Sequence, residues 1–264
     1  MQIGKSKRAV SGICDAQADR VEVRGRDLTS ELMGRIGFTD YFFLLLTGKD
    51  ASEEQRFFLD LLLVAIAEHG LVPTVLAARM TLAADPGSLQ GAVAAGILGA
   101  GPVILGTSEL CGRLLTQANT EVAAGGEPDA VALALVRAIR DAGGKAPGFG
   151  HPIHKPVDPR AVRILALAEE RGVAGRHVAM ARRIERAVAE VWGRPLVMNV
   201  SMPIAAVLLD LDFPAAMIKA IPLLARTASI LAHLAEEQRN PIGFLMAGKA
   251  EEAVAYERDG DGDA

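Results

Sequence analysis

The stretch Pro147-Gly-Phe-Gly-His-Pro-Ile-His-Lys-Pro-Val-Asp-Pro-Arg160 is the most informative part of this chain. It places an imidazole, His151, directly after a Gly-Phe-Gly turn, and a guanidinium, Arg160, directly after an Asp-Pro pair. Glycine adopts backbone conformations that other residues rarely reach, and it lets a ligand approach the backbone closely. Proline disfavours helix at its own position and at the preceding residue. We therefore expect a stiff loop that presents an acid–base group and an anion-binding group to a small acidic substrate.

The composition of the whole chain favours a mostly helical protein with a large core. The 264 residues are 50% hydrophobic but only 4% aromatic, and alanine, leucine and valine are the main apolar types. Alanine and leucine lead the helix-propensity scale. A chain of this length allows one or two domains. Its net charge is -4 with acids and bases interspersed, so it lacks the basic footprint of a nucleic-acid-binding protein.

Cysteine usage and targeting patterns predict a reduced, cytoplasmic setting. Cys14 and Cys111 form no Cys-x-x-Cys pair, and Cys111 is expected in the core. The basic residues among the first eight are not followed by an apolar segment, so no signal peptide is expected. The uncharged stretch from Gly91 to Gly106 is too short and glycine-rich to span a membrane. The charged tail from Glu257 onward is predicted to be disordered.

Capping residues and apolar periodicity predict a series of helices after about 26 residues of irregular structure or short strands. Ser52-Glu-Glu-Gln55 is typical of a helix start, Pro73 is suited to a first helical position, and Asp85-Pro86-Gly87 predicts a turn. Residues 41–46 are interpreted as an apolar turn. The predicted helices cover residues 30–36, 53–68, 73–84, 89–99, 107–123, 128–142, 158–171, 175–192, 203–210 and 214–235.

Four polar groups interrupt the apolar helical segments. They are Glu68-His69, His151 with Arg160, Asn199-Val-Ser201, and Leu224-Ala-Arg-Thr227. Together with the earlier Val23-Arg-Gly-Arg-Asp-Leu28 and Phe43-Leu-Leu-Leu-Thr-Gly48, they follow the order of motifs in the citrate synthase superfamily, which the chain resembles over residues 21–240. The Glu68-His69-Gly70 turn is similar to the ADHG turn of the citryl-CoA lyase module of ATP-citrate lyase. The chain thus resembles citryl-CoA lyase-like proteins most.

This resemblance implies an all-α, two-domain fold that forms a homodimer. Residues 1–105 and 200–264 would form the large helical domain, which holds the dimer core and the substrate acid site. Residues 106–199 would form the smaller helical domain, which closes over coenzyme A.

The resemblance also gives three positions a part in the chemistry. His69 would help to hold the oxaloacetate or citrate part of the substrate, and His151 would hydrogen-bond the oxygen on its central carbon. Ser201 stands where the family has the aspartate that moves a methyl proton, and Ile104 stands where it has the histidine that steadies the enolate. Losing a general acid or base costs about 10²–10⁴ in rate, and losing an oxyanion donor costs about 10²–10³. Efficient citrate synthase activity is therefore not expected.

Further residues are matched to ligand binding. Arg160 and Arg226 would bind substrate carboxylates, and Arg239 is a looser match to an arginine that the family contributes across the dimer. The positions implied on the coenzyme A side are Gly148, Phe149, Gly150 and Lys155. The other two histidines, His177 and His233, are interpreted as surface or packing residues.

The leading hypothesis is cleavage of a citryl-CoA-like 3-hydroxyacyl-CoA into acetyl-CoA and oxaloacetate, or a related keto acid. His151 would take the proton of the C3 hydroxyl, and a water on Ser201, or His154, would replace the missing aspartate. The coenzyme A thioester is a substrate, and neither a metal nor a permanent cofactor is expected, since no third ligand accompanies His151 and His154. Two alternatives stay open. One is a non-catalytic protein that binds acyl-CoA or tricarboxylate, and the other is a carbon–carbon lyase or acyltransferase for a less polar acyl-CoA.

Overall fold

The computed structural model describes residues 9–257, so the predictions for the basic N-terminus and for residues 258–264 lie outside the described residues. The chain forms two compact units, Met1–Asp60 and Leu61–Ala264. The two domains implied by the resemblance, with residues 106–199 as the smaller one, stay a prediction.

The first unit begins with short antiparallel strands, as predicted. The sheet has the order β1-β2-β3, with Cys14 opposite Val23 and Glu22 opposite Asp27. Its elements are β1 (Cys14–Ala16), β2 (Val21–Val23), β3 (Arg26–Asp27), the single π-turn η1 (Leu28–Leu32) and α1 (Phe38–Thr47). The Asp27 carboxylate accepts hydrogen bonds from the backbone N–H groups at the start of η1, so this turn starts and ends earlier than the predicted helix over 30–36.

Helix α2 (Glu53–Ala67) crosses from the first unit into the second. The other elements of the second unit are α3 (Pro73–Ala84), α4 (Leu89–Leu98), α5 (Thr107–Ala123), α6 (Pro128–Asp141), α7 (Pro159–Glu170), α8 (Arg176–Trp192), α9 (Ser201–Asp210), the 3₁₀ turn η2 (Ala215–Met217), α10 (Ala220–Glu237) and α11 (Gly243–Ala253). The predicted helices from 53 to 192 are confirmed with small shifts at their ends. Two predictions were incomplete, because residues 41–46 belong to the longer helix α1 and the range 214–235 divides into η2 and α10. Helix α11 was not predicted.

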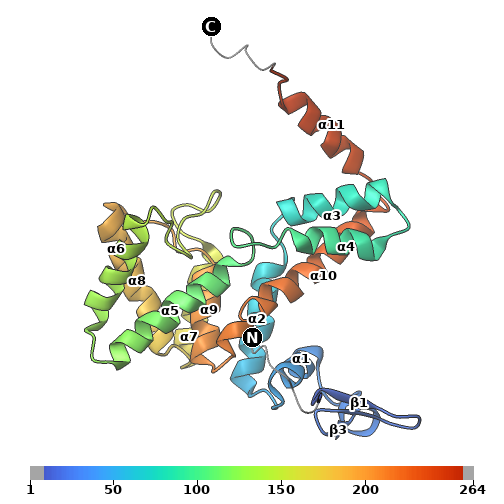
Figure 1. The fold of residues 1–264 in the computed structure, drawn as a ribbon, viewed down its shortest axis with the longest axis horizontal. Helices are drawn as coiled ribbons and strands as arrows, with labels where there is room; N and C mark the ends of the chain where they lie inside the picture. The colour runs from blue at the N-terminus through green and yellow to red at the C-terminus, as the bar shows by residue number, and fades with distance from the viewer. Residues whose placement is uncertain (1–8, 258–264) are drawn as a thin grey trace. The chain divides into compact units, whose positions relative to one another are not determined.

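Small residues let α3, α4 and α10 pack side by side (Figure 1). A Cβ atom at Gly96 of α4 would lie 2.7 Å from the Thr74 carbonyl oxygen and 2.8 Å from Ile230 Cδ1. The helices can therefore approach this closely only with glycine at that position. The buried side chains of this group are Ala78, Leu82, Ala92, Ile230 and Leu234.

Helices α5, α6, α8 and α9 pack against one another, and α7 packs on α9 (Figure 1). Cys111 of α5 is fully buried, as predicted. The loop that carries His151 lies between α6 and α7.

The segment Ala215–Glu237 is long and apolar enough to cross a membrane by length and composition alone. It contains α10, which carries the buried Arg226 and packs on α3 and α4. These contacts are those of a core helix in a globular fold.

Candidate active site

The loop that carries His151 is fixed through its two glycines. Gly148 and Gly150 have φ angles of 80° and 89°, in the left-handed region that glycine reaches without strain, as the sequence predicted. Gly150 N–H donates to the Val197 carbonyl over 2.7 Å, and Asn199 N–H donates to the Gly148 carbonyl over 2.8 Å. The Asn199 side chain donates to the Gly150 carbonyl over 3.0 Å. The loop is therefore tied to the segment that leads into α9.

The buried Asp158 and the half-buried Arg160 form an ion pair at the start of α7. The Asp158 carboxylate caps the helix and accepts hydrogen bonds from Arg160 Nε and Nη2 at 3.0 and 2.9 Å and from Val200 N–H at 3.1 Å. Burial raises the pKa of Asp158, but the bonds and charge of Arg160 outweigh that effect and leave the pKa below its ordinary value. Arg160 thus uses two of its three nitrogens on Asp158 and keeps Nη1 for another partner.

Arg226 of α10 is a buried cation that lacks a full set of partners. Its side chain is 3% exposed, Nη2 donates to the Ile66 carbonyl over 3.3 Å, and the buried Nε and Nη1 atoms have no hydrogen-bond partner among the described residues. Burial lowers the pKa of Arg226, although the charge of Glu68 opposes the shift. Because a guanidinium stays protonated in proteins, an anion is the partner that this site lacks.

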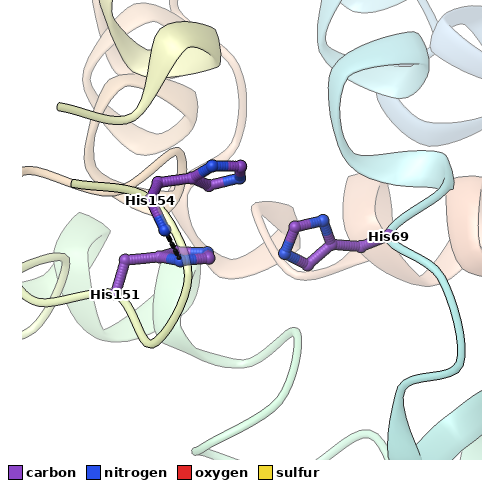
Figure 2. A group of neighbouring side chains, drawn as sticks. All are labelled: His69, His151 and His154. Atoms are coloured by element: carbon purple, nitrogen blue, oxygen red, sulfur yellow. Dashed lines mark hydrogen bonds between the residues drawn. The ribbon is translucent and has the colours of Figure 1, made fainter.

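Three imidazoles face one another (Figure 2), and two of them, His69 and His151, line the same cavity as Arg160 and Arg226. The ring centroids of His151 and His154 are 4.3 Å apart, and the His69 centroid lies 5.3 Å from His151 and 5.4 Å from His154. Nε2 of His69 and Nε2 of His154 are buried without a hydrogen-bond partner among the described residues. The structure therefore brings together two loops that are about 80 positions apart in the sequence.

The surroundings keep two of these rings neutral. Burial lowers the pKa of His69, and the charges of Arg160, His154 and Arg226 lower it further. Burial also lowers the pKa of His151, followed by the effect of His154. Since the ordinary value is 6.5, both rings are uncharged at neutral pH.

Backbone hydrogen bonds determine which nitrogen of His151 carries the proton. Its Nδ1 accepts from Ile153 N–H at 3.1 Å and from His154 N–H at 2.9 Å. In the neutral ring the proton must then sit on Nε2, so this atom is a hydrogen-bond donor.

His69 supplies the third imidazole that was not apparent in the sequence, and ligand nitrogens of the three histidines lie within 4.8 Å of one another. A metal-bound histidine normally donates the N–H of its other nitrogen, whereas His151 Nδ1 faces two N–H donors. Two arginine cations also lie close to His69. The cluster therefore fits a metal ion poorly and an anionic ligand well.

A cavity of about 350 Å³ collects the predicted substrate residues. His69, His151, Arg160, Ser201 and Arg226 all line it. Part of its wall is apolar and consists of Val103, Ile104, Leu105, Ile153 and Ile204. The predicted catalytic histidines and two of the three predicted carboxylate-binding arginines thus share one space.

A second cavity, of about 720 Å³, adjoins the first at Gly150 and His151. Lys155 lines it, as do two arginines that the sequence reasoning missed, Arg182 and Arg194. Arg182 lies on α8, where it resembles any exposed charge of an amphipathic helix, so no motif distinguishes it.

Three predicted ligand-binding residues lie outside both cavities. Gly148 is buried against Cys111 and Met202, and Phe149 pairs with Met198. Arg239 is exposed after the end of α10. The structure therefore brings Lys155 and Gly150, but not these three, to the surface of a cavity.

Comparison with known proteins shows which family and fold the chain resembles. The family model described as "Citrate synthase, C-terminal domain" matches residues 11–243. The curated protein "Putative citrate synthase 2" of Mycobacterium tuberculosis is 33% identical over 204 residues, which are 71% of this chain and 48% of that protein. The Mycobacterium bovis protein of the same name matches equally. The chain thus spans about half the length of the curated relatives it matches.

Solved structures confirm the predicted all-α, citrate synthase-like fold. Citryl-CoA lyase from Hydrogenobacter thermophilus is 26% identical with a TM-score of 0.83, over 95% of this chain and 94% of that one. Citrate synthase from Pyrobaculum aerophilum is 26% identical with a TM-score of 0.62, over 78% and 51%. ATP citrate lyase from Methanothrix soehngenii, solved with citrate and coenzyme A, has a similar fold at 21% identity and a TM-score of 0.77, over 97% and 42%. The chain belongs to the citrate synthase family.

Proposed function

We propose that this protein cleaves a citryl-CoA-like 3-hydroxyacyl-CoA into acetyl-CoA and oxaloacetate, or a related keto acid. The observation that carries the proposal is the buried guanidinium of Arg226, with Nε and Nη1 unpartnered, in one cavity with His69, His151 and Arg160. A substrate carboxylate would give Arg226 the charge-assisted hydrogen bonds that it lacks. The similarity to a citryl-CoA lyase over 94% of that chain supports the choice of reaction.

The second cavity is suited to the coenzyme A part of the substrate. Lys155, Arg182 and Arg194 provide positive charge for phosphate groups. The apolar part of the lining, which would contact the pantetheine chain or the adenine ring, includes Val157, Ala161, Val162, Leu165, Leu196, Val197 and Met198. Because His151 lines both cavities, the thioester end of the substrate would lie next to its imidazole.

The tautomer of His151 assigns the proton-transfer roles. His151 donates a hydrogen bond from Nε2–H to the C3 oxygen and keeps its proton, and His69, whose Nε2 has no partner among the described residues, accepts the hydroxyl proton. The O–H electron pair forms the carbonyl of the keto acid, and the C2–C3 electron pair becomes the enolate of acetyl-CoA. This assignment differs from the sequence-based prediction, in which His151 took the proton. Nδ1 of His151 already accepts two backbone N–H bonds and Nε2 carries the ring proton, so the neutral ring has no free nitrogen to act as the base.

The enolate carbon must then receive a proton. Ser201 begins α9 at the cavity wall, and its hydroxyl is not an acid in the neutral range, so it acts by holding a water molecule. His154 is the other group we consider, because its Nε2 is buried and unpartnered. Ile104 offers no hydrogen bond to the enolate oxygen, and we therefore expect slow turnover.

The test is to incubate the purified protein with citryl-CoA and to follow oxaloacetate with an NADH-linked dehydrogenase. We expect cleavage above the buffer rate and a loss of about 10²–10⁴ in His69→Ala and in His151→Ala. Arg137→Ala, which changes an exposed arginine on α6, is the control and should keep wild-type activity. The proposal fails if the protein gives no acceleration and His151→Ala gives the same trace as the wild type.

The apolar wall with Ile104 and Ile153 favours one second candidate, the same chemistry on a less polar acyl-CoA. A panel of 3-hydroxyacyl-CoA esters separates it from the first by the ratio of kcat/KM values. Calorimetric binding of coenzyme A esters without turnover would instead indicate a non-catalytic binding protein. A homodimer and a cytoplasmic location, which the sequence predicted, are part of this proposal, and sedimentation analysis tests the dimer.

A further inference from the structure

The turn that carries His69 is held by the neighbouring carboxylate of Glu68. Glu68 Oε1 accepts hydrogen bonds from His69 N–H at 2.9 Å and from Gly70 N–H at 2.5 Å. Its other oxygen, Oε2, accepts from Ser229 Oγ–H at 2.5 Å and lies 3.1 Å from His233 Nε2. One carboxylate thus ties the His69 turn to helix α10.

His233 connects this carboxylate to a buried arginine. Its Nδ1 lies 3.3 Å from Arg79 Nη1. A guanidinium has donors only, so Nδ1 accepts this bond and the ring proton sits on Nε2. His233 Nε2–H therefore donates to Glu68, and the two hydrogen bonds run in one direction, from Arg79 through His233 to Glu68.

Arg79 is itself fixed on its other side. Its side chain is 2% exposed, Nε donates to Glu237 Oε2 and Nη1 donates to Glu236 Oε2, both over 2.7 Å. Glu237 Oε1 in turn accepts from Ile242 N–H at 2.9 Å and from Gly243 N–H at 2.7 Å, where α11 begins. A continuous series of hydrogen bonds therefore runs from the start of α11 to the His69 turn.

We infer that Glu68, oriented by His233 and Arg79, is the positioning residue for His69. Glu68 does not line the substrate cavity, whereas His69 does, so Glu68 acts through the turn and not on the substrate. A misplacement of about 1 Å in a reacting group can lower the rate about 10²-fold, so the position of this turn matters for catalysis. Only this kinetic consequence rests on the proposed function.

Glu68→Gln is the informative variant because the side chain keeps its shape while one carboxylate oxygen, an acceptor, becomes an NH₂ group, a donor. If the amide oxygen faces the His69 and Gly70 N–H groups, the amide NH₂ meets His233 Nε2–H. If the amide is reversed, the NH₂ meets the two backbone N–H groups. Either orientation places donors against donors, and the turn loses part of its support.

The primary measurement is the NMR titration of the imidazole nitrogens, which is practical because the chain has five histidines. In Glu68→Gln the loosened turn exposes His69, and we expect this relief of burial to outweigh the lost Glu68 charge, so that the pKa of His69 rises toward the ordinary 6.5. The charged and titratable groups around His69, which are Arg160, Arg226, Asp158, His151 and His154, stay in place. The NMR chemical shifts of His177, which is paired with Asp210, should be the same in Glu68→Gln and in the wild type at a fixed pH.

The second measurement separates positioning from general destabilisation. For citryl-CoA we expect kcat to fall about 10- to 100-fold in Glu68→Gln, with an unchanged Kd for free coenzyme A. Glu190→Gln makes the same chemical change at an exposed site on α8 and should behave as the wild type. Ser229→Ala removes one donor to Oε2 and should shift His69 in the same direction by a smaller amount.

A His69 titration that is identical in Glu68→Gln and in the wild type would overturn the inference. If Glu68→Gln does not fold, Ser229→Ala decides in the same way. If the wild type does not cleave citryl-CoA but Glu68→Gln still shifts His69, the proposed function fails and the positioning role stands.

Discussion

Replacing Arg226 by methionine should stabilise the ligand-free protein while it removes substrate binding. The guanidinium is 3% exposed and, within residues 9–257, makes one hydrogen bond, to the Ile66 carbonyl at 3.3 Å, so most of its lost hydration is uncompensated. Replacing buried charged groups by apolar residues of similar volume often stabilises proteins by about 1–4 kcal/mol. With roughly 2–4 °C per kcal/mol for chains of this size, Arg226→Met should raise Tm by roughly 2–16 °C.

The same variant should lose affinity for small acids. Truncating one partner of a buried, hydrogen-bonded charge pair costs about 2–5 kcal/mol, which is about a 30- to 4,000-fold weaker Kd at 1.4 kcal/mol per decade. Scanning calorimetry without ligand measures the first effect, and titration calorimetry with oxaloacetate or citrate measures the second. Stability and binding should therefore change in opposite directions.

Two control variants sharpen this prediction. Arg226→Lys keeps a buried charge and should not raise Tm, although it also weakens binding because an ammonium does not reproduce the planar fork. Arg137→Met on the surface of α6 should stay within about 0.5 kcal/mol of the wild type. A lower Tm for ligand-free Arg226→Met, together with unchanged citrate affinity, would show that Arg226 is a structural residue and that the reasoning is wrong.

Three further predictions concern the chemistry, the acid stability and the loop. Ser201→Asp restores a carboxylate at the first position of α9 and should speed citryl-CoA cleavage by up to about 10²–10⁴; an unchanged kcat would mean that another group protonates the enolate. Burial raises the pKa of Asp210, but hydrogen bonds from His177, Val178 and Gly175 outweigh it and leave the pKa below 3.8, so its stabilisation is present above that pH and is lost as the pH falls through the folded value. Asp210→Asn should therefore cost about 1.5–3 kcal/mol in urea unfolding at pH 7 and progressively less below pH 3.8, and a constant difference at all pH values would contradict this. Gly148→Ala should lower the free energy of unfolding by about 2–5 kcal/mol through positive φ and overpacking, since its Cβ would lie 2.8 Å from Cys111 Sγ. Gly150→Ala meets nothing within 4 Å and should lower it by only about 1–2 kcal/mol. Equal losses of stability in the two variants would refute the steric argument.

The sequence was sufficient to predict most of the polar groups that line the 350 Å³ cavity. Arg226 is noticeable because a charge inside an apolar helix needs a buried partner, and the glycines beside His151 are noticeable because prolines follow them. Helix ends with strong signals, such as Ser52 before α2 and Pro73 at the start of α3, were placed correctly. These features depend on local chemistry, which the sequence contains directly.

Other features depend on the direction of backbone N–H groups in the folded chain and on contacts between residues far apart in the sequence. Sequence patterns do not reveal these features. The proton of His151 is fixed by the N–H groups of Ile153 and His154, whose directions depend on the folded loop. Glu68 and His233 are 165 positions apart, so neither residue indicates the other in the sequence. His233 was interpreted as a surface or packing residue for this reason, and Arg182 was missed because it resembles a solvated charge.

The charges around the cavity would also explain how the proposed neutral base and the proposed polyanion site can lie together. Burial and then the charge of Arg160 lower the pKa of His69, so the ring is unprotonated and able to accept a proton before the substrate arrives. A substrate carboxylate that binds Arg160 Nη1 and Arg226 would compensate the positive charge that holds this pKa down. The basicity of His69 would then increase in the complex, where the C3 hydroxyl proton has to be taken. The arginines would thus keep the base neutral in the free protein and strengthen it on binding, and this requires both guanidinium groups to lie beside His69, as they do.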